Sequence, residues 1–279
     1  MLIKRLQNKG LFKLEFGKED NTCNICGRVC KLSRDHIFPK GLGLPKVIVI
    51  RSPLGSPLKY PDSLSECGLV QKTICRECNN LLGYKYDQDL IKLIKSASLQ
   101  CNQMNNLRNI GLTIPNIQLE LSFIPDRVAR SVTGHLLAAR VSEQGLTVPD
   151  MQKFVLEEEY CLPPNYHLYM WFCPLHDPLV TLENVYIHLP TMSALIYETY
   201  KVFPLAFLFS NNDMKISGSV DLLGYKHNSP QDVRIDMMNY PNPQWPENAG
   251  LPGAEYGKII GANFANSKST VYSARRRGY

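Results

Sequence analysis

Two Cys-x-x-Cys pairs are the residues of this sequence whose types and spacing most clearly suggest chemistry. Cys23 and Cys26 form the first pair, and Cys75 and Cys78 form the second. Each pair supplies two thiolates from one tight turn, and two such turns complete the tetrahedral shell of a structural zinc ion. The sequence therefore predicts one tightly bound Zn²⁺ held by these four side chains.

An Asp-His dipeptide, Asp35-His36, lies between the two pairs, in a gap longer than a minimal zinc ribbon needs. Side chains alternate along a strand, so at a strand end Asp35 could face a metal while His36 faces a substrate. Asn79 follows the second pair directly, at the expected start of a helix, and its side-chain oxygen is a second candidate ligand. Oxygen ligands of this kind suit Mg²⁺ or Mn²⁺ better than Zn²⁺.

The combined pattern over about residues 20 to 90 resembles the HNH endonucleases. It consists of a Cys-x-x-Cys pair, the run "DHIFPK", and a second pair that continues as "CNN" with Gly83 and Asp87. The resemblance implies a β-hairpin and a helix around one catalytic Mg²⁺ or Mn²⁺, with His36 as general base and Asp35 and Asn79 as metal ligands. It also implies double-stranded DNA as substrate, and restriction or phage defence is a typical setting of such proteins.

One position departs from the family pattern. Many members carry a loop asparagine that steers the base, about five residues before the second pair, where this sequence has Val70 followed by Gln71. Gln71, Asn80 or no residue at all takes that role here.

Positive charge is concentrated in the part of the chain that holds these motifs. Residues 1 to 95 contain 17 Lys and Arg against 9 Asp and Glu, a net charge of +8, whereas residues 96 to 279 contain 14 against 16, a net charge of −2. A local positive field suits a polyphosphate partner such as DNA, although a solvated basic face is the competing interpretation. The candidate phosphate contacts are Lys31, Arg34, Lys40, Lys72, Arg76 and Lys85.

The composition, 44% hydrophobic and 20% charged over 279 residues, is that of an ordinary globular protein. We find no apolar run of bilayer length and no signal-peptide core at the N-terminus, so we expect a cytoplasmic protein without a membrane partner. Nine cysteines in such a chain point to metal binding before disulfides. Those outside the pairs are expected to be small buried residues, with Cys30 and Cys67 as weaker competitors for zinc: Cys30, Cys67, Cys101, Cys161 and Cys173.

The periodicity predicts an α+β fold with two domains. We expect a zinc-stabilised HNH module with a ββα-metal fold over residues 1–95, and a mixed α+β domain for recognition, dimerisation or sensing over residues 96–279. Apolar spacing and start signals predict a helix within 79–100, interrupted or closely packed at Gly83, and another from Pro125 to near Gly145. Strands are expected at 116–123, 166–173, 181–189, 204–209 and 215–225, and irregular structure over the last forty residues.

Several other groups have a plainer explanation. His135 is interpreted as a satisfied buried histidine, and His176-Asp177 as a loop pair without a catalytic role. An aromatic run is interpreted as strand core before a base-stacking surface, and the basic tail as a solvated end or a nucleic-acid contact. The residues of the run are Tyr166, Tyr169, Trp171 and Phe172, and those of the tail are Arg275, Arg276 and Arg277.

The sequence thus leads to a metal-dependent DNA endonuclease as the expected function. A non-catalytic, zinc-containing nucleic-acid-binding protein is the alternative, but it has no use for Asp35, His36 and Asn79 together. A zinc domain that binds proteins is a third hypothesis, against which the local basic excess counts. A second copy of the chain, or a partner protein of a defence system, is a further candidate partner.

Overall fold

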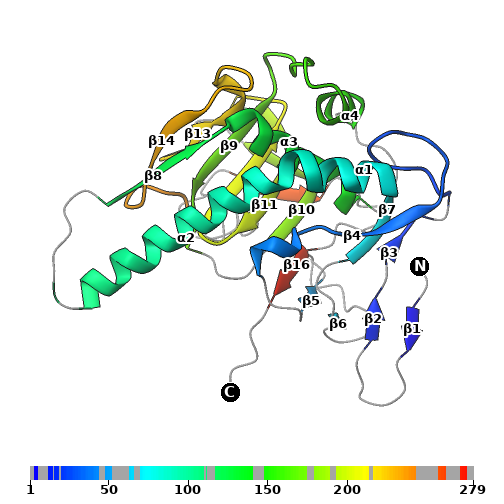
Figure 1. The fold of residues 1–279 in the computed structure, drawn as a ribbon, viewed down its shortest axis with the longest axis horizontal. Helices are drawn as coiled ribbons and strands as arrows, with labels where there is room; N and C mark the ends of the chain where they lie inside the picture. The colour runs from blue at the N-terminus through cyan, green and yellow to red at the C-terminus, as the bar shows by residue number, and fades with distance from the viewer. Residues whose placement is uncertain are drawn as a thin grey trace.

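The structure is a computed structural model, and it confirms a mixed α+β architecture (Figure 1). No helix in its described part has the length and apolar character that a bilayer span requires. The residues that it describes are 3–5, 12–14, 16–18, 20–43, 48–51, 63–65, 70–109, 111, 117–140, 148–174, 179–188, 193–213, 216–242, 257–261 and 271–274.

A nine-stranded antiparallel sheet is the largest of the sheets within these ranges (Figure 1). Its strands follow the order β13-β9-β12-β11-β10-β16-β5-β6, and β15 also pairs with β10. They are β5 Ile48–Arg51, β6 Ser63–Ser65, β9 His167–Phe172, β10 Leu179–His188, β11 Ser193–Val202, β12 Leu205–Ser210, β13 Val220–Asp221, β15 Gly257–Gly261 and β16 Val271–Ala274.

Three smaller sheets complete the strand pairing of the described residues. β1 pairs with β2, β8 pairs with β14, and a three-stranded sheet has the order β3-β7-β4. The last of these carries the candidate site. The bounds are β1 Ile3–Arg5, β2 Phe12–Leu14, β3 Phe16–Gly17, β4 Leu32–His36, β7 Val70–Cys75, β8 Gln118–Phe123 and β14 Gln231–Asp236.

One long helical segment follows β7. It begins as α1 (Arg76–Leu81), continues through a π-helical turn, η2 (Leu82–Tyr86), and becomes α2 (Asp87–Asn109). The predicted helix is therefore present, and the interruption expected at Gly83 is a π turn in a continuous helix. The other helices are α3 (Pro125–Ala139) and α4 (Val148–Leu156), with 3₁₀ turns η1 (Lys40–Leu42) and η3 (Leu222–Gly224).

Helix α3 is the centre of the core. Pro125 and Asp126 begin it as predicted, because proline suits the first helical turn and a carboxylate suits the positive end of the dipole. The helix packs against α2 and the π turn, and also against β10 and β11 of the large sheet (Figure 1). A side chain at Gly134 would overlap Leu82, so this glycine lets α3 approach the π turn closely.

The predicted strands with clear periodicity are confirmed. In β8, Leu119, Leu121 and Phe123 are buried while Glu120 and Ser122 are exposed, which is the period of two that one covered face produces. The aromatic run is buried, and all of it except Tyr166, which precedes the strand, lies in β9, so it is strand core.

Three predicted boundaries are wrong. Helix α3 ends at Ala139 rather than near Gly145, because Arg140 is extended and its guanidinium pairs with buried Glu198. Of residues 216–225, only Val220–Asp221 form a strand, because the Asp221 carboxylate accepts the Leu223 N–H and so caps a 3₁₀ turn. The last forty residues contain β15 and β16, because β10 offers both of them its backbone groups.

Residues from both sides of position 95 share one cluster of buried side chains. Ile74 and Leu82 belong to it together with Val132, Phe207 and Ile235. Helix α2 runs through position 95 without interruption. The division of the chain into two domains stays a prediction, and the candidate site lies against helices and strands from both parts.

Candidate functional site

The four predicted zinc ligands lie together. The sulfur atoms of Cys23, Cys26, Cys75 and Cys78 are all within 4.8 Å of one another. Thiolates bound to Zn²⁺ at about 2.3 Å in a tetrahedron are about 3.8 Å apart, and Cys26 Sγ lies 3.9 Å from Cys75 Sγ. The cluster could therefore hold a zinc ion.

Local backbone geometry brings the two pairs to one point. Gly27 has a φ of 68°, which a residue with a side chain rarely adopts, and its N–H closes the first turn on the Cys23 carbonyl at 2.9 Å. Cys75 ends β7 and caps α1, where its sulfur accepts the Cys78 N–H at 3.5 Å. Its own N–H donates to Cys23 Sγ at 3.2 Å. The cluster thus ties the first turn to the junction of β7 and α1.

The thiol groups of the cluster differ in how readily they lose a proton, because each thiolate disfavours negative charge on its neighbours. A hydrogen bond with Cys78 lowers the pKa of Cys23 to about 4, while burial raises the pKa of Cys75 to about 12. A divalent cation offsets this repulsion because it favours the thiolate form of every ligand. The Arg28 guanidinium adds positive charge beside the cluster, because its Nε donates to Cys26 Sγ at 3.3 Å.

Strand β4 presents Asp35 and His36 to different surroundings, as alternation predicts. Asp35 is buried, whereas His36 is half-buried on the other face of the strand. The pairing of β4 with β7 shifts register between Ser33 and Asp35, so that Lys72 and Thr73 form a bulge in β7 opposite Arg34. Bulges of this kind redirect side chains and are frequent beside active sites.

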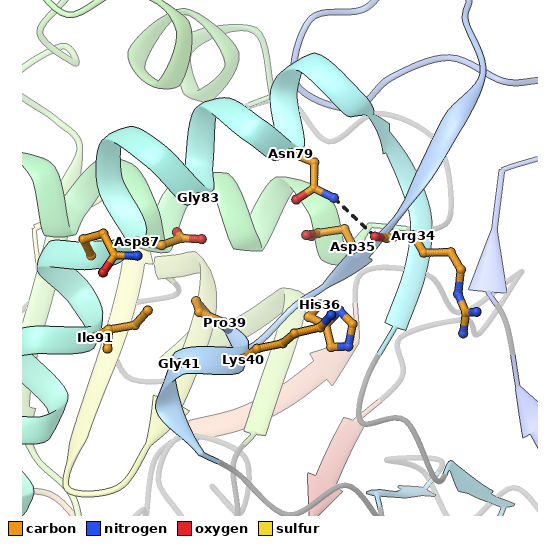
Figure 2. Close-up of a pocket in the computed structure, with 11 residues that line it drawn as sticks. Arg34, Asp35, His36, Pro39, Lys40, Gly41, Asn79, Gly83, Asp87 and Ile91 are labelled. Atoms are coloured by element: carbon orange, nitrogen blue, oxygen red, sulfur yellow. Dashed lines mark hydrogen bonds between the residues drawn. The ribbon is translucent and has the colours of Figure 1, made fainter.

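The β4 residues opposite the bulge also position Asn79. The amide nitrogen Nδ2 of Asn79 donates to the Arg34 carbonyl at 3.2 Å and to Ser33 Oγ at 3.3 Å. Both bonds use the nitrogen, so the side-chain oxygen is left to face the space beside Asp35 (Figure 2). A helix and a strand thereby hold the two predicted oxygen ligands in fixed positions.

A pocket of about 280 Å³ brings the predicted catalytic residues together. It lies between β4 and η1 on one side and the α1–η2–α2 segment on the other (Figure 2). Gly83 lines it without a side chain, and a Cβ there would meet nothing within 4 Å, which keeps the helix side open. The lining residues are Arg34, Asp35, His36, Pro39, Lys40, Gly41, Asn79, Gly83, Asp87, Gln88 and Ile91.

Asp35 has an unsatisfied buried oxygen. No hydrogen-bond donor among the described residues reaches Asp35 Oδ2. Burial raises the pKa of this carboxyl to about 6, with Asp87 adding to the shift and His135 opposing it. A buried carboxylate oxygen without a hydrogen-bond donor is costly, so this environment fits a hard cation bound through oxygen atoms.

The His36 imidazole is in an environment that keeps it neutral. Its burial lowers its pKa, and the positive charges of Lys40 and Arg34 lower it further. A neutral imidazole can accept a proton, which is the state that a general base requires.

The structure adds a contact that the sequence does not reveal. Asp87 is buried, and its Oδ1 accepts a hydrogen bond from Ser131 Oγ at 2.7 Å and lies 3.0 Å from His135 Nε2. His135 is buried, as predicted, and its Nε2 contacts a residue that lines the pocket, but no hydrogen-bond partner among the described residues reaches its Nδ1, so the histidine is only half satisfied. Asp87 belongs to the motif of the second cysteine pair, whereas no sequence signal connects that motif to residues 131 and 135.

The remaining predicted residues fall into distinct places. Among the basic candidates, Arg34 and Lys40 line the pocket, and Lys85 instead pairs with Glu158 at 2.9 Å. Val70 is the ladder partner of His36 and Gln71 that of Asp35, while Asn80 is exposed. Cys67, His176, Asp177 and the arginines of the tail lie outside the described residues.

The cysteines outside the two pairs differ in burial. Cys101 and Cys173 are buried, as predicted, and Cys30 is partly buried. Cys161 is exposed, so its prediction is wrong, because it lies in irregular chain between α4 and β9 rather than in an element that packs.

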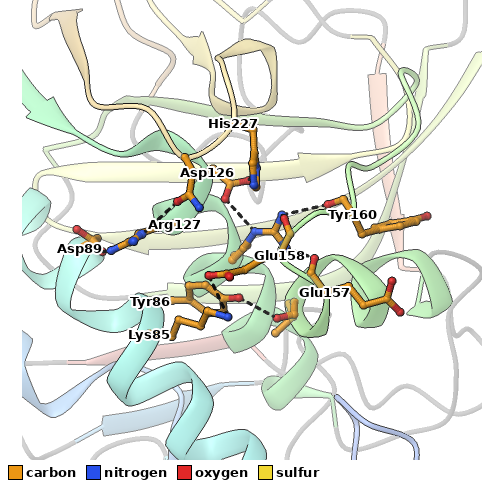
Figure 3. A network of polar contacts seen from close by, with 12 residues as sticks. Lys85, Tyr86, Asp89, Asp126, Arg127, Glu157, Glu158, Tyr160 and His227 are labelled. Atoms are coloured by element: carbon orange, nitrogen blue, oxygen red, sulfur yellow. Dashed lines mark hydrogen bonds and ion pairs between the residues drawn. The ribbon is translucent and has the colours of Figure 1, made fainter.

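A second buried polar network lies near the pocket but serves the fold. The Arg130 side chain is fully buried and donates to the carbonyls of Phe154, Glu157, Glu158 and Tyr160, at or beyond the end of α4. Its Nε also pairs with Asp126 at 2.9 Å. Lys85, Tyr86, Glu157 and Tyr160 surround this part of the molecule (Figure 3). The guanidinium therefore satisfies the carbonyl groups that a helix end leaves open.

Replacing Arg130 with methionine should lower the free energy of unfolding by about 3 to 5 kcal/mol, because the Asp126 carboxylate and several carbonyls lose a buried partner. Chemical denaturation measures this change. Arg127→Met is the matched control on the same helix, because Arg127 is more exposed and its ion pair with Asp89 spans 3.6 Å. It should cost less than about 1 kcal/mol. Equal losses of unfolding free energy in the two variants would contradict the stabilising role assigned to Arg130.

Comparisons of the chain with family models, with curated proteins and with solved structures found no match.

Proposed function

We propose that this protein is a divalent-metal-dependent endonuclease of the HNH type that hydrolyses phosphodiester bonds in DNA. The observation that carries the proposal is the pocket, which Asp35, His36 and Asn79 all line. A strand and a helix supply these side chains, and the cysteine cluster ties the end of β7 to the start of α1. The resemblance in the sequence assigns the same three residues to catalysis.

His36 is the proposed general base. It is half-buried at the edge of the pocket, and its lowered pKa favours the neutral form at physiological pH. It takes a proton from water, and the resulting hydroxide attacks phosphorus in line with the leaving 3′ oxygen. A positioned general base of this kind contributes about 10²- to 10⁴-fold in rate.

Asp35 and Asn79 are the proposed ligands of the catalytic metal. A bound Mg²⁺ or Mn²⁺ supplies neutralisation of charge on the phosphate and on the leaving oxygen. Asp35 contributes the unsatisfied Oδ2, and Asn79 contributes its side-chain oxygen while its nitrogen stays bonded to β4. The cysteine cluster takes no part in the reaction and holds zinc for stability.

DNA is the proposed substrate because of the charge around the pocket. Arg34 and Lys40 line it and Arg76 is exposed at the start of α1, within the part of the chain that has a net charge of +8. Positive side chains beside a hydrolytic site contact phosphates without reading sequence. A restriction or phage-defence role agrees with this substrate.

The alternative proposal is a zinc-containing protein that binds nucleic acid without cutting it. It uses the cysteine cluster and the basic surface but gives no reason for a buried carboxylate oxygen without a donor beside a histidine. Incubation of purified protein with plasmid DNA and Mg²⁺ or Mn²⁺ separates the two proposals. Nicked or linear product supports the nuclease, and binding without cleavage under both metals supports the alternative.

The two metals of the nuclease should respond differently to chelation. Mild EDTA treatment should stop cleavage while zinc stays bound, because Mg²⁺ held by a few oxygen ligands exchanges readily and four thiolates hold zinc tightly. Added Mg²⁺ or Mn²⁺ should restore cleavage. Asn79→Ala should need at least about tenfold more Mg²⁺ for half-maximal rate, with unchanged zinc content and DNA binding.

Asn106→Ala is the matched control for this metal titration. Asn106 is an exposed asparagine on α2, and it does not line the pocket. If Asn79→Ala cleaves as fast as wild type without extra Mg²⁺, the assignment of Asn79 as a ligand is wrong, and Asn80 or Asp87 becomes the next candidate.

A further inference from the structure

Asp87 is a carboxylate that the proposed mechanism does not use, although it lines the same pocket as Asp35 and Asn79. It lies eight residues after Asn79 on the same helical segment. In a regular α-helix, eight residues advance the side chain about 80° past two full turns, which would place the two residues on different faces. The intervening turn is π-helical, with the Asp87 N–H bonded to the Leu82 carbonyl five residues earlier.

The π turn winds more slowly per residue and therefore brings Asp87 back towards the face of Asn79. Figure 2 shows the carboxyl groups of Asp35 and Asp87 pointing towards the same space, with the Asn79 amide beside them. Gly83 lies between Asn79 and Asp87 in the sequence and adds no side chain to that face. π turns are frequent at functional sites for this reason: they redirect one side chain at a small cost in hydrogen bonding.

Helix α3 fixes one oxygen of Asp87 and leaves the other unused by these contacts. Ser131 Oγ and His135 Nε2 both contact Oδ1, at 2.7 and 3.0 Å. His135 reaches this position because its neighbour Gly134 allows α3 to approach the π turn at Leu82. A carboxylate whose orientation is fixed through one oxygen can offer the other to a metal ion, as is common for protein ligands held by a second layer of hydrogen bonds.

From this geometry we infer that Asp87 is a third protein ligand of the divalent cation, with Ser131 and His135 as its positioning residues. The inference rests on the cation site of the proposed function. Independent support comes from Asp35, whose buried Oδ2 has no donor among the described residues and faces the same pocket. Two carboxylates and an amide oxygen form a set of hard donors that suits Mg²⁺ or Mn²⁺.

The assignment means that the C-terminal part of the chain completes the site. Asp35 and Asn79 come from the segment that resembles HNH enzymes, whereas Ser131 and His135 come from α3. A fragment that ends near residue 95 would retain Asp87 but lose the groups that hold it.

The test is a titration of the zinc-loaded, full-length protein with Mn²⁺, followed by electron paramagnetic resonance of the free ion. Asp87→Asn keeps the size of the side chain and removes its charge, and it should raise the dissociation constant for Mn²⁺ at least about tenfold. Asp89→Asn is the matched control, because Asp89 lies on the same helix, pairs with Arg127 and does not line the pocket. It should bind Mn²⁺ like wild type.

The outcomes separate this inference from the nuclease proposal. If Asp87→Asn loses Mn²⁺ affinity and the wild type cuts no DNA, the three-ligand site stands and the nuclease proposal fails. If the wild type cuts DNA and Asp87→Asn retains wild-type affinity for Mn²⁺, the nuclease proposal stands and Asp87 is not a ligand.

A measurement without a variant covers the case in which Asp87→Asn fails to fold. Crystals of the wild-type protein soaked in Mn²⁺ would give an anomalous signal at the site. A peak about 2.1 Å from an Asp87 oxygen supports the assignment. A peak coordinated by Asp35 and Asn79 alone, or no peak in the pocket, overturns it.

Discussion

Replacing His36 with alanine should lower the rate of DNA cleavage by about 10²- to 10⁴-fold, the range that a positioned general base supplies. The variant should keep its zinc and its fold, because His36 is half-buried at the pocket edge and is not part of the buried core. Single-turnover cleavage of a plasmid at saturating Mg²⁺ measures the change. DNA binding should be unaltered, since the lost group acts on water and not on phosphate.

The pH profile distinguishes a base from a residue that only supports the pocket. The neutral imidazole is the active form, so the wild-type rate should fall as the pH falls through the pKa of His36. Burial and the charges of Lys40 and Arg34 place that pKa below its usual value of 6.5, so the loss should occur below pH 6.5. At saturating Mg²⁺ the bound cation keeps Asp35 ionised, so His36→Ala should lack this dependence, and added imidazole should restore part of its activity.

His227→Ala is the matched control for the loss of a histidine. His227 contacts Asp126 in the second polar network and does not line the pocket. It should cleave at a rate close to that of wild type. Wild-type cleavage by His36→Ala would remove the base from the mechanism and leave the pocket without a residue for that step.

The ligand types of this site could be predicted from sequence because their spacing is local. A Cys-x-x-Cys turn places two sulfur atoms together whatever surrounds it. The cluster of four then requires only that the two turns lie against each other. Alternation along β4 separates Asp35 from His36 for a similarly local reason. The same logic predicts β8 and the start of α3, where periodicity and end signals agree.

The features that shape the pocket depend on contacts between distant residues. The bulge opposite Arg34 depends on the pairing of β4 with β7, and the π turn shifts the face on which Asp87 lies. The contact of Asp87 with His135 joins residues 48 positions apart. Neither the periodicity nor the composition of one segment contains this information, so sequence reasoning leaves His135 as an isolated buried residue.

Strand β11 shows the same limit in the large sheet. Its residues include Glu198 and Lys201, which suggest exposure, yet both side chains are buried. Glu198 is buried because Arg140, at the end of α3, provides its counter-charge. A charged residue with a partner from another element looks like a surface residue in the sequence, because the partner is not a neighbour along the chain.

Replacing Cys75 with serine should remove the bound zinc and unfold the region around it. Structural zinc contributes an apparent binding free energy of about 10 to 16 kcal/mol at pH 7 in small zinc domains. Whole domains are stable by only about 5 to 15 kcal/mol, so even part of that contribution decides whether the region folds. Cys75 is also the residue whose sulfur caps α1 and whose N–H bonds to Cys23.

Elemental analysis and thermal unfolding measure this effect together. The wild type should contain about one zinc ion per chain, and Cys75→Ser should contain none after dialysis. Its unfolding should begin at lower temperature, and amide exchange in β7 and α1 should lose protection first, because the cluster ties these elements to the turn at Cys23 and Cys26.

Two other cysteines provide controls of graded severity. Cys161→Ser alters an exposed thiol far along the chain from the cluster and should change neither zinc content nor stability. Cys30→Ser tests the competing ligand, since the Cys30 sulfur contacts the Arg28 carbonyl and lies outside the set of four. Well-folded wild-type protein without zinc would contradict the assignment of the four cysteines as a structural zinc site. If Cys30→Ser loses zinc while Cys75→Ser retains it, Cys30 is a ligand and the assignment of the second pair is wrong.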